Sequence, residues 1–280
     1  MDSRLNLISR IEAELKSYNG CMGIYISDGK GTKIAIRDQE KFETASTIKM
    51  FILAALFAEV EKGNLSLHEN LIYKEEHVVD GSGILKSLEL GTALSVKNLA
   101  TLMIIISDNI ATNMIIQYVT VEKINQFILE LGLLHTKLHN SINFERYEAL
   151  GTTTPSEYGV LLEKLAAGTL VSQQASMQMM EICKMQHYNT MLTKQFPPYF
   201  MDSDNYEEEI ISVASKSGSM DACRNDGGII MTPYGYYVIV LLNKGFTDAM
   251  YYSEHPAIVF GSKISRLVFD QYLTLEGHLE

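Results

Sequence analysis

Strand-like segments occur at both ends of this chain, and helical segments fill the region between them. Apolar, β-branched runs at residues 21–27 and 33–37 flank the turn sequence DGKG, which predicts a β-hairpin. Three further strand-like runs follow much later, at residues 211–217, 227–232 and 236–243. Because strands must satisfy their backbone hydrogen bonds with other strands, this pattern predicts one sheet assembled from both ends of the chain.

Helical periodicity predicts an amphipathic helix at the N-terminus, a closing helix and a helical block in the middle. The predicted helices after the first span residues 47–61, 96–106, 111–118, 121–131, 156–167, 172–185 and 256–272. We therefore predict an α+β fold in which terminal helices flank an antiparallel β-sheet, with an inserted all-helical lobe. The predicted boundaries are residues 1–43 and 208–280 for the sheet lobe and 44–207 for the helical lobe, with the active site in the cleft between them.

The charge of the chain and the composition of its segments argue against nucleic-acid binding, a metal site and a membrane span. The 280 residues include 34 acids and 23 bases, and no Lys or Arg run could neutralise a series of phosphates, so we expect no nucleic-acid partner. The three cysteines and seven histidines lack the spacing of metal ligands. No apolar run is long enough for a membrane span, and the charged N-terminus lacks the apolar core of a signal peptide. We expect a cytoplasmic protein, or an exported one if a leader was trimmed.

The segment TASTIKMF, residues 44–51, places Lys49 at the start of a predicted helix that is otherwise almost wholly apolar. Such a helix is buried on most sides, where an ammonium is costly unless it is paired or neutral. Burial and the positive end of the helix dipole both lower the pKa of Lys49. Because positions i and i+3 share a helix face, Ser46 lies beside this amine, which sets a nucleophile next to a base.

Two interpretations of this pair are open at this point. The pattern S-x-x-K occurs a second time, at Ser27 and Lys30 in the predicted hairpin turn, where the lysine is expected to be solvated. Lys49 could in the same way extend its side chain to solvent from the first turn of its helix. Further motifs have to decide between a catalytic lysine and a surface lysine.

The triplet Ser107-Asp108-Asn109 interrupts the apolar pattern between two predicted helices. Positions two apart on a continuous helix point away from each other, so Ser107 and Asn109 serve one site only if the chain leaves helical geometry there. We predict a loop or kink at residues 107–109. The alternative is a plain helix boundary at which Asp108 or Ser107 caps the next helix.

The triplet Lys216-Ser217-Gly218 ends a strand-like run. A cation and a hydroxyl at a strand end suit a carboxylate-bearing substrate, and Gly218 leaves room for close approach of a backbone or a ligand. An ordinary strand end with a solvated lysine is the alternative.

The order S-x-x-K, S-D-N, K-S-G in one chain resembles the serine penicillin-recognising enzymes, the class A β-lactamase and DD-peptidase group. The segments GTALSVKNL and GTTTPSEYGVLLEKLAAGTLVS extend this resemblance, which covers roughly residues 44–242. It implies a hydrolase that opens a β-lactam, or a related amide or ester, through a covalent acyl-serine intermediate. It also implies a small-molecule β-lactam or peptidoglycan-like substrate and no metal or cofactor, and we expect a monomer.

The resemblance implies a path for the proton during acylation. Ser46 attacks the acyl carbonyl, and Lys49 takes or relays its proton. Ser107 passes a proton to the leaving nitrogen, while Asn109 hydrogen-bonds the substrate amide.

Substrate binding is implied by position in the same way. Lys216 and Ser217 orient the substrate carboxylate. The backbone N–H groups of Ser46 and of Ser219, which follows Gly218, form an oxyanion hole.

The sequence departs from the class A pattern at the deacylation step, where a glutamate in an E-x-x-L-N context is expected. The segment NFERYEALGTTTP offers Glu145 and Glu148, but Gly151 follows Leu150 and the context is missing. Without a positioned base the acyl-enzyme lingers. The alternatives are then a penicillin-binding peptidase or esterase, or a non-enzymatic sensor of β-lactams or peptidoglycan fragments.

Two further charges follow the K-S-G triplet, at Arg224 and Asp226 in ACRNDGGI. We interpret both as charges that could face the cleft.

Overall fold

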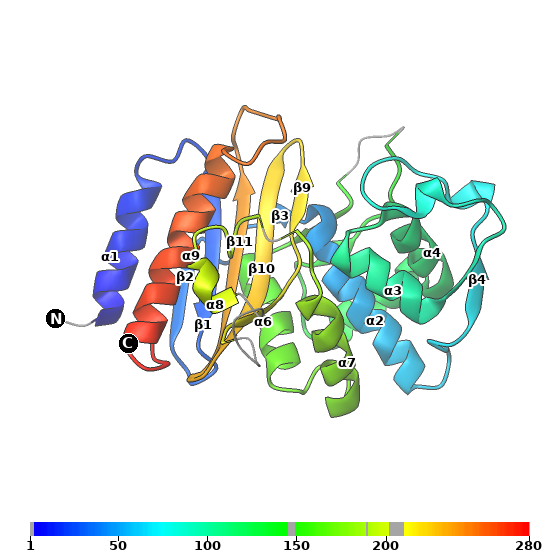
Figure 1. Cartoon of the computed structure of the whole chain (residues 1–280), viewed down its shortest axis with the longest axis horizontal. Coiled ribbons are helices and arrows are strands. Elements are labelled where there is room, and N and C mark those ends of the chain that lie inside the picture. Colours follow the sequence, from blue (N-terminus) through cyan, green and yellow to red (C-terminus); the bar gives the residue numbers. More distant parts are fainter. Residues whose placement is uncertain (1–2, 145–148, 189, 202–209, 280) are drawn as a thin grey trace.

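An antiparallel sheet joins the first hairpin to strands from the end of the chain in the computed structural model, which describes residues 3–144, 149–188, 190–201 and 210–279 (Figure 1). Its strands lie in the order β2 (Lys33–Ile36), β1 (Cys21–Ser27), β11 (Gly235–Lys244), β10 (Cys223–Thr232) and β8 (Ser212–Ser215). The short strand β9 (Gly218–Met220) pairs with the start of β10. The predicted α+β fold class and the sheet built from both chain ends are confirmed.

The hairpin between β1 and β2 turns on an aspartate followed by glycine. Asp28 Oδ1 accepts hydrogen bonds from the N–H groups of Lys30 (2.8 Å) and Thr32 (3.2 Å), and Gly29 has a φ of +68°. Ser27 is buried whereas Lys30 is exposed, so this second S-x-x-K pair does not share a buried site.

Side chains alternate between two cores along the central strands. On β11, Ile239 and Leu241 face one core and Val240 and Leu242 face the other. A strand with both faces buried needs apolar residues at successive positions, which explains the run YYVIVLLN.

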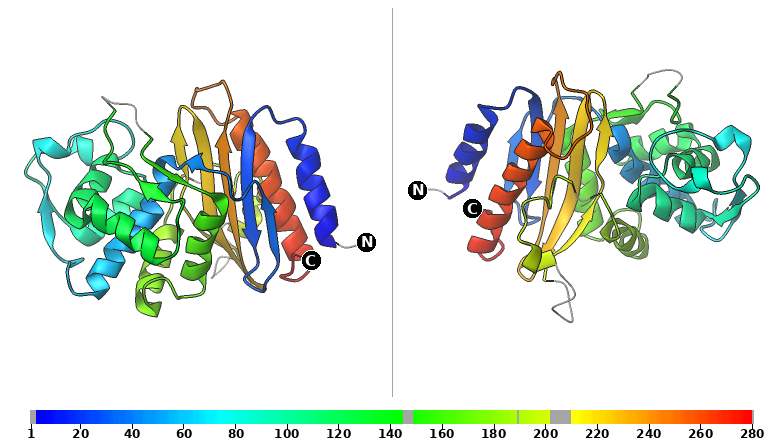
Figure 2. Two further views of the ribbon diagram at one scale, coloured as in Figure 1. Left: turned by 180° about the vertical axis from the view of Figure 1, so that it is seen from behind. Right: turned by 45° about the horizontal axis from the view of Figure 1, so that its top comes forward.

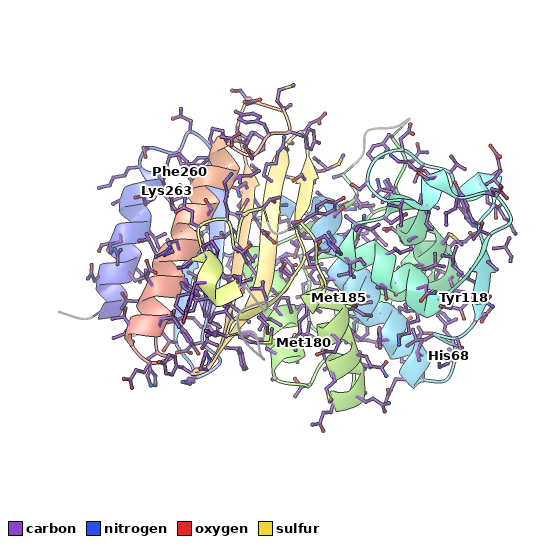
Figure 3. All side chains as sticks on the ribbon, viewed as in Figure 1. His68, Tyr118, Met180, Met185, Phe260 and Lys263 are labelled. Carbon is purple, nitrogen blue, oxygen red and sulfur yellow. The ribbon has the colours of Figure 1, made fainter. Side chains whose placement is uncertain are left out.

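The terminal helices α1 (Ser3–Leu15) and α9 (Pro256–Thr274) lie side by side on one face of the sheet (Figure 2). Figure 3 labels Phe260 and Lys263 on α9, near α1. Lys263 Nζ lies 5.2 Å from the ring centroid of Phe260 and 3.5 Å from Glu14 Oε2 on α1, so one lysine links the two helices.

The other face of the sheet packs against α6 (Pro155–Ala166) and α7 (Gln173–Lys184). Beyond them lie α2 (Lys49–Glu61), α3 (Val96–Ile105), α4 (Asn109–Val119) and α5 (Val121–Glu130) (Figure 1). All residues of α2 from Lys49 to Glu59 are buried, as its apolar composition predicts. None of the helices within the described ranges combines the length and the apolar character that crossing a bilayer requires.

Short elements complete the fold. They are the strands β3 (Phe42–Glu43), β4 (Asn70–Ile72), β5 (Ala93–Ser95), β6 (Lys137–Leu138) and β7 (Gly151–Thr153), the helix α8 (Pro198–Met201), and the 3-10 turns η1 (Ala45–Ile48), η2 (Glu75–His77) and η3 (Leu85–Ser87). The ladder β3-β7-β6 fixes the chain directly before η1.

Hydroxyl side chains mark where several helices begin. Ser95 Oγ accepts from the N–H of Asn98 at the start of α3, and Ser172 Oγ accepts from the N–H of Ala175 at the start of α7. Such a cap contributes about 1 kcal/mol, so these helix starts are encoded locally.

Candidate active site

Ser46 lies in the 3-10 turn η1, which leads directly into α2. Ala45 before it has a φ of +45°, a left-handed conformation that non-glycine residues seldom adopt. Ser46 is half-buried and lines a cleft of about 410 Å³. Within the described part of the chain, its backbone N–H donates to no protein acceptor. The hydroxyl and the N–H of Ser46 are both available to a molecule in the cleft.

Lys49, at the first position of α2, is fully buried, so it does not extend to solvent. Its Nζ donates to Ser107 O (2.9 Å), Ser107 Oγ (3.0 Å) and Asn109 Oδ1 (2.9 Å). Burial, followed by the positive charge of Lys216, holds the pKa of Lys49 well below its usual value. The backbone N–H of Lys49 donates to Ser46 O, whereas the hydrogen bonds of its Nζ to described residues all go to Ser107 and Asn109.

The chain leaves helical geometry between α3 and α4, as the S-D-N triplet predicts. Ser107 has a φ of +55°, Asp108 is extended, and α4 starts at Asn109. Ser107 and Asn109 therefore both face Lys49 although they are only two positions apart.

The carboxylate of Asp108 organises the backbone on either side of the site. Its Oδ1 accepts from the N–H of Ala111, and its Oδ2 accepts from the N–H groups of Ile84 (2.7 Å) and Leu85 (2.9 Å). A Cβ on Gly83 would lie 2.2 Å from Asp108 Oδ2, so only glycine fits there. The interpretation of Asp108 as a helix cap is confirmed, and it also ties a distant loop to the start of α4.

Asn109 is held by that same loop. Its Nδ2 donates to Asp80 O (3.0 Å), and its backbone N–H donates to Ser82 O (3.0 Å). Gly81 and Ser82 line the cleft, although the sequence shows this segment only as a turn with two glycines. The two glycines were the one feature of the sequence that could have predicted this position, because they allow the loop to pass close to Asn109.

Lys216 comes from the opposite side of the cleft, in the break between β8 and β9. It is fully buried, and its Nζ donates to Ser107 Oγ (3.2 Å) and to Ser217 O (2.7 Å). Burial lowers the pKa of Lys216 to about 7, while the nearby Asp226 acts in the opposite direction. One serine hydroxyl, that of Ser107, therefore lies between two buried amines.

Gly218 brings β9 against the turn that carries Ser46. A Cβ on Gly218 would lie 2.7 Å from the backbone nitrogen of Ser46, 2.7 Å from that of Thr47 and 2.9 Å from Thr44 O. The expectation that this glycine permits close approach of another backbone is confirmed. Ser219, the next residue, is exposed and lines the cleft.

Arg224 and Asp226 do not face the cleft, so that hypothesis is wrong for both. Both are buried in β10. Asp226 accepts from the N–H groups of Leu192 and Gly227, and burial raises its pKa to about 7. Alternation along β10, which starts at Cys223 and is longer than predicted, turns these side chains inward.

Glu145 and Glu148 lie outside the described residues. Next to them, Ile142, Phe144 and Leu150 form an apolar part of the cleft lining. The described chain contains no cluster of three or more His, Cys, Asp or Glu side chains that could hold a metal ion. The described site is therefore a serine, two buried lysines and amide or hydroxyl partners.

Comparisons with known proteins place the sequence of this chain in a family. The family model described as the Beta-lactamase enzyme family matches residues 6–272. Beta-lactamase BRO-1 of Moraxella catarrhalis is 29% identical over 167 residues, which are 58% of this chain and 53% of the relative. The match thus spans about half the length of that curated protein.

Solved structures match over nearly the whole chain. A β-lactamase from Sphaerobacter thermophilus superposes with a TM-score of 0.82 at 26% identity and covers 98% of this chain and 97% of its own. A mutant of PBP-A, solved as an acyl-enzyme complex with penicillin G, has a TM-score of 0.82 at 26% identity and covers 96% of this chain and 97% of its own.

Proposed function

The chain belongs to the beta-lactamase enzyme family, and on this premise we propose that it is a serine hydrolase that opens a β-lactam, or a related amide or ester, through a covalent acyl-serine intermediate. One observation carries the proposal. A fully buried lysine with a lowered pKa lies one helical turn after a cleft serine and hydrogen-bonds the S-D-N triplet.

Acylation begins with attack of Ser46 Oγ on the carbonyl carbon. The hydroxyl proton passes to the neutral amine of Lys49, whose burial favours the uncharged form. Ser107 accepts a hydrogen bond from Lys49 and one from Lys216, so its own hydroxyl can donate to the leaving nitrogen. The C–N bond breaks as that nitrogen gains the Ser107 proton, Lys49 passes the proton taken from Ser46 on to Ser107 Oγ, and the acyl group stays on Ser46.

Binding groups surround the reacting carbonyl. The N–H groups of Ser46 and Ser219 are proposed as the oxyanion hole, in which one donor is typically worth about 3 kcal/mol in the transition state. Asn109 Nδ2 is proposed to bind the substrate amide with the N–H that Asp80 leaves free. Lys216 and Ser217 are proposed to hold the substrate carboxylate.

The site residues come from both parts of the chain. Ser46 and Asn109 belong to residues 44–207, and Ser219 belongs to residues 208–280. We retain the two-lobe division, residues 1–43 with 208–280 and residues 44–207, as a proposal that accounts for a cleft lined from both sides.

Deacylation requires a base that activates water, and Glu145 and Glu148 are retained as proposed candidates. The lining that the structure describes beside them carries amides and apolar side chains and no carboxylate, which favours slow deacylation. The second candidate function is therefore a penicillin-binding peptidase, esterase or sensor. The likeness to PBP-A over 96% of the chain supports this alternative.

Incubation with benzylpenicillin, followed by intact mass spectrometry over time, tests the proposal. We expect an adduct with the mass of the penicillin, located on Ser46 and absent in Ser46→Ala. Ser27→Ala removes the serine of the other S-x-x-K pair and is expected to acylate like wild type. Rapid loss of the adduct indicates a β-lactamase, and persistence indicates the second function. Absence of any adduct while the benzylpenicillin stays intact contradicts both.

A further inference from the structure

The cleft has one charged side chain among its described lining residues, Asp221. Asp221 lies in the connection between β9 and β10, two residues after Ser219, and it is exposed. No ion pair between described residues involves Asp221. A carboxylate at the rim of a cleft with no protein cation paired to it can pair with a cation on the substrate.

Tyr251 fixes the position of that carboxylate. Its hydroxyl donates to Asp221 Oδ1 at 3.1 Å, and both residues line the cleft. Burial, followed by this hydrogen bond, raises the pKa of Tyr251 to about 12, so the hydroxyl is a donor at neutral pH. Tyr251 is nevertheless 60% exposed, which leaves much of the ring open to a molecule in the cleft.

Arg224 explains why Tyr251 stays there. Its guanidinium donates to Ala249 O and Met250 O, both at 2.9 Å, and also to Cys223 O at 2.9 Å. The guanidinium carbon lies 4.1 Å from the centroid of the Tyr251 ring. Arg224 is thus a buried clamp on the segment before Tyr251, and its charge is directed to backbone carbonyls.

Another part of the cleft lining carries apolar side chains. Ile142, Phe144 and Leu150 contribute them, beside the amides of Asn140 and Asn143, and Phe144 is 47% exposed. A ring of the substrate could therefore lie between Phe144 and Tyr251, which are aromatic surfaces on two different parts of the chain.

We propose that Asp221 and Tyr251, held by Arg224, form a side-chain subsite that selects β-lactams whose acyl side chain carries an aromatic ring and an ammonium group. This inference rests on the proposed function and names the substrate class for that site. Asp221 and Tyr251 contact the substrate, and Arg224 is a positioning residue.

Three penicillins that differ at a single carbon test the subsite. Benzylpenicillin, ampicillin and carbenicillin share one phenyl ring and carry hydrogen, an ammonium and a carboxylate at the side-chain α-carbon. We measure the second-order rate constant for acylation of Ser46 from the initial rate of adduct formation, by mass spectrometry after rapid quenching, before deacylation removes the adduct. We expect ampicillin to react about fivefold faster than carbenicillin, as one partly exposed ion pair predicts.

Two variants remove parts of the subsite, and two control variants test whether any change nearby has the same effect. In Asp221→Asn, the ratio of the ampicillin rate to the carbenicillin rate is expected to fall to about one, and acylation by benzylpenicillin in the same variant shows that Ser46 still reacts. In Tyr251→Phe, which keeps the ring but loses the hydrogen bond to Asp221, the difference is expected to shrink. Tyr252→Phe and Glu254→Gln are matched controls outside the described cleft lining, and both are expected to keep the wild-type preference.

The outcomes are distinguishable. Equal rates for ampicillin and carbenicillin in wild type, or an unchanged preference in Asp221→Asn, overturn the subsite while acylation by benzylpenicillin still supports the proposed function. Failure of all three penicillins to acylate Ser46 overturns the proposed function and the subsite with it.

Discussion

Lys49 Nζ lies 3.0 Å from Ser107 Oγ, across 58 positions of sequence. The same hydroxyl accepts from Lys216 Nζ at 3.2 Å. Two buried amines therefore donate to one hydroxyl. Their positive charges repel each other, and the charge of Lys216 is one cause of the lowered pKa of Lys49. The Ser107 hydroxyl is therefore placed to relay a proton during acylation.

Ser107→Ala removes the proposed link to the leaving nitrogen. We expect the acylation rate constant for benzylpenicillin to fall about 100-fold, within the range of general acid catalysis. Lys49 keeps Ser107 O and Asn109 Oδ1 as acceptors, so the melting temperature should change little. A variant that acylates at the wild-type rate would show that Ser107 is not on the proton path.

The pH dependence of acylation should be bell-shaped for a substrate that carries a carboxylate. Acylation requires neutral Lys49, so the rate constant falls as the pH drops through the lowered pKa of this amine. It also requires charged Lys216, whose pKa of about 7 sets the alkaline limb. Stopped-flow measurements from pH 5 to pH 10 check this, and Lys216→Arg should remove the alkaline limb. A rate constant still rising beyond pH 9 contradicts the assignment.

Gly218→Ala should disturb the nucleophile. Its Cβ would meet the backbone nitrogens of Ser46 and Thr47 at 2.7 Å, and backbone atoms cannot rotate away. We expect a loss of about 1–3 kcal/mol of stability, as for overpacked sites, together with slower acylation. Urea unfolding and acylation rates measure both effects. Ala222→Ser, at an exposed position in the next turn, is the control and should be neutral.

Asp108→Ala should unfold more easily than a simple loss of a helix cap predicts. The carboxylate accepts from the N–H groups of Ala111, Ile84 and Leu85, so two loop N–H groups, one of them on buried Leu85, lose their partner along with the cap. We expect a loss of about 3 kcal/mol. Ser95→Ala removes only a cap and should cost about 1 kcal/mol in the same urea titration. Equal losses in the two variants would contradict a separate role for the loop contacts.

Glu59 should contribute stability that depends on pH. Hydrogen bonds from Asn64, then from Lys123 and Lys62, lower the pKa of Glu59 from 4.5 to about 2. A lowered pKa means that the unfolded chain binds the proton first, so the contribution is complete above pH 4.5 and is lost as the pH falls toward 2.

The comparison of Glu59→Gln with wild type measures this contribution. The variant should be less stable at pH 7, and the difference should narrow steadily between pH 4.5 and pH 2. Glu89→Gln, at an exposed position, should show no such convergence. A difference that stays constant down to pH 2 would mean that Glu59 acts through packing and not through its charge.

The sequence alone was sufficient for features that depend on neighbours along the chain. The β1–β2 hairpin, the buried helix after Ser46 and the break at residues 107–109 follow from turn chemistry, apolar composition and helix geometry, which act over a few residues. The sequence also predicted that strands from both chain ends share one antiparallel sheet, whereas the order β2-β1-β11-β10-β8 came from the structure.

Contacts between distant segments were decided by tertiary structure. Tyr251 donates a hydrogen bond to Asp221, and Arg224 donates one to Ala249 O. The periodicity of the sequence does not predict the course of the loops that bring these residues together. Arg224 and Asp226 were wrongly expected in the cleft, because one residue more or less in a strand turns a side chain to the opposite face. Local free energies set which elements form, whereas the packing of those elements sets which side chains share a cleft.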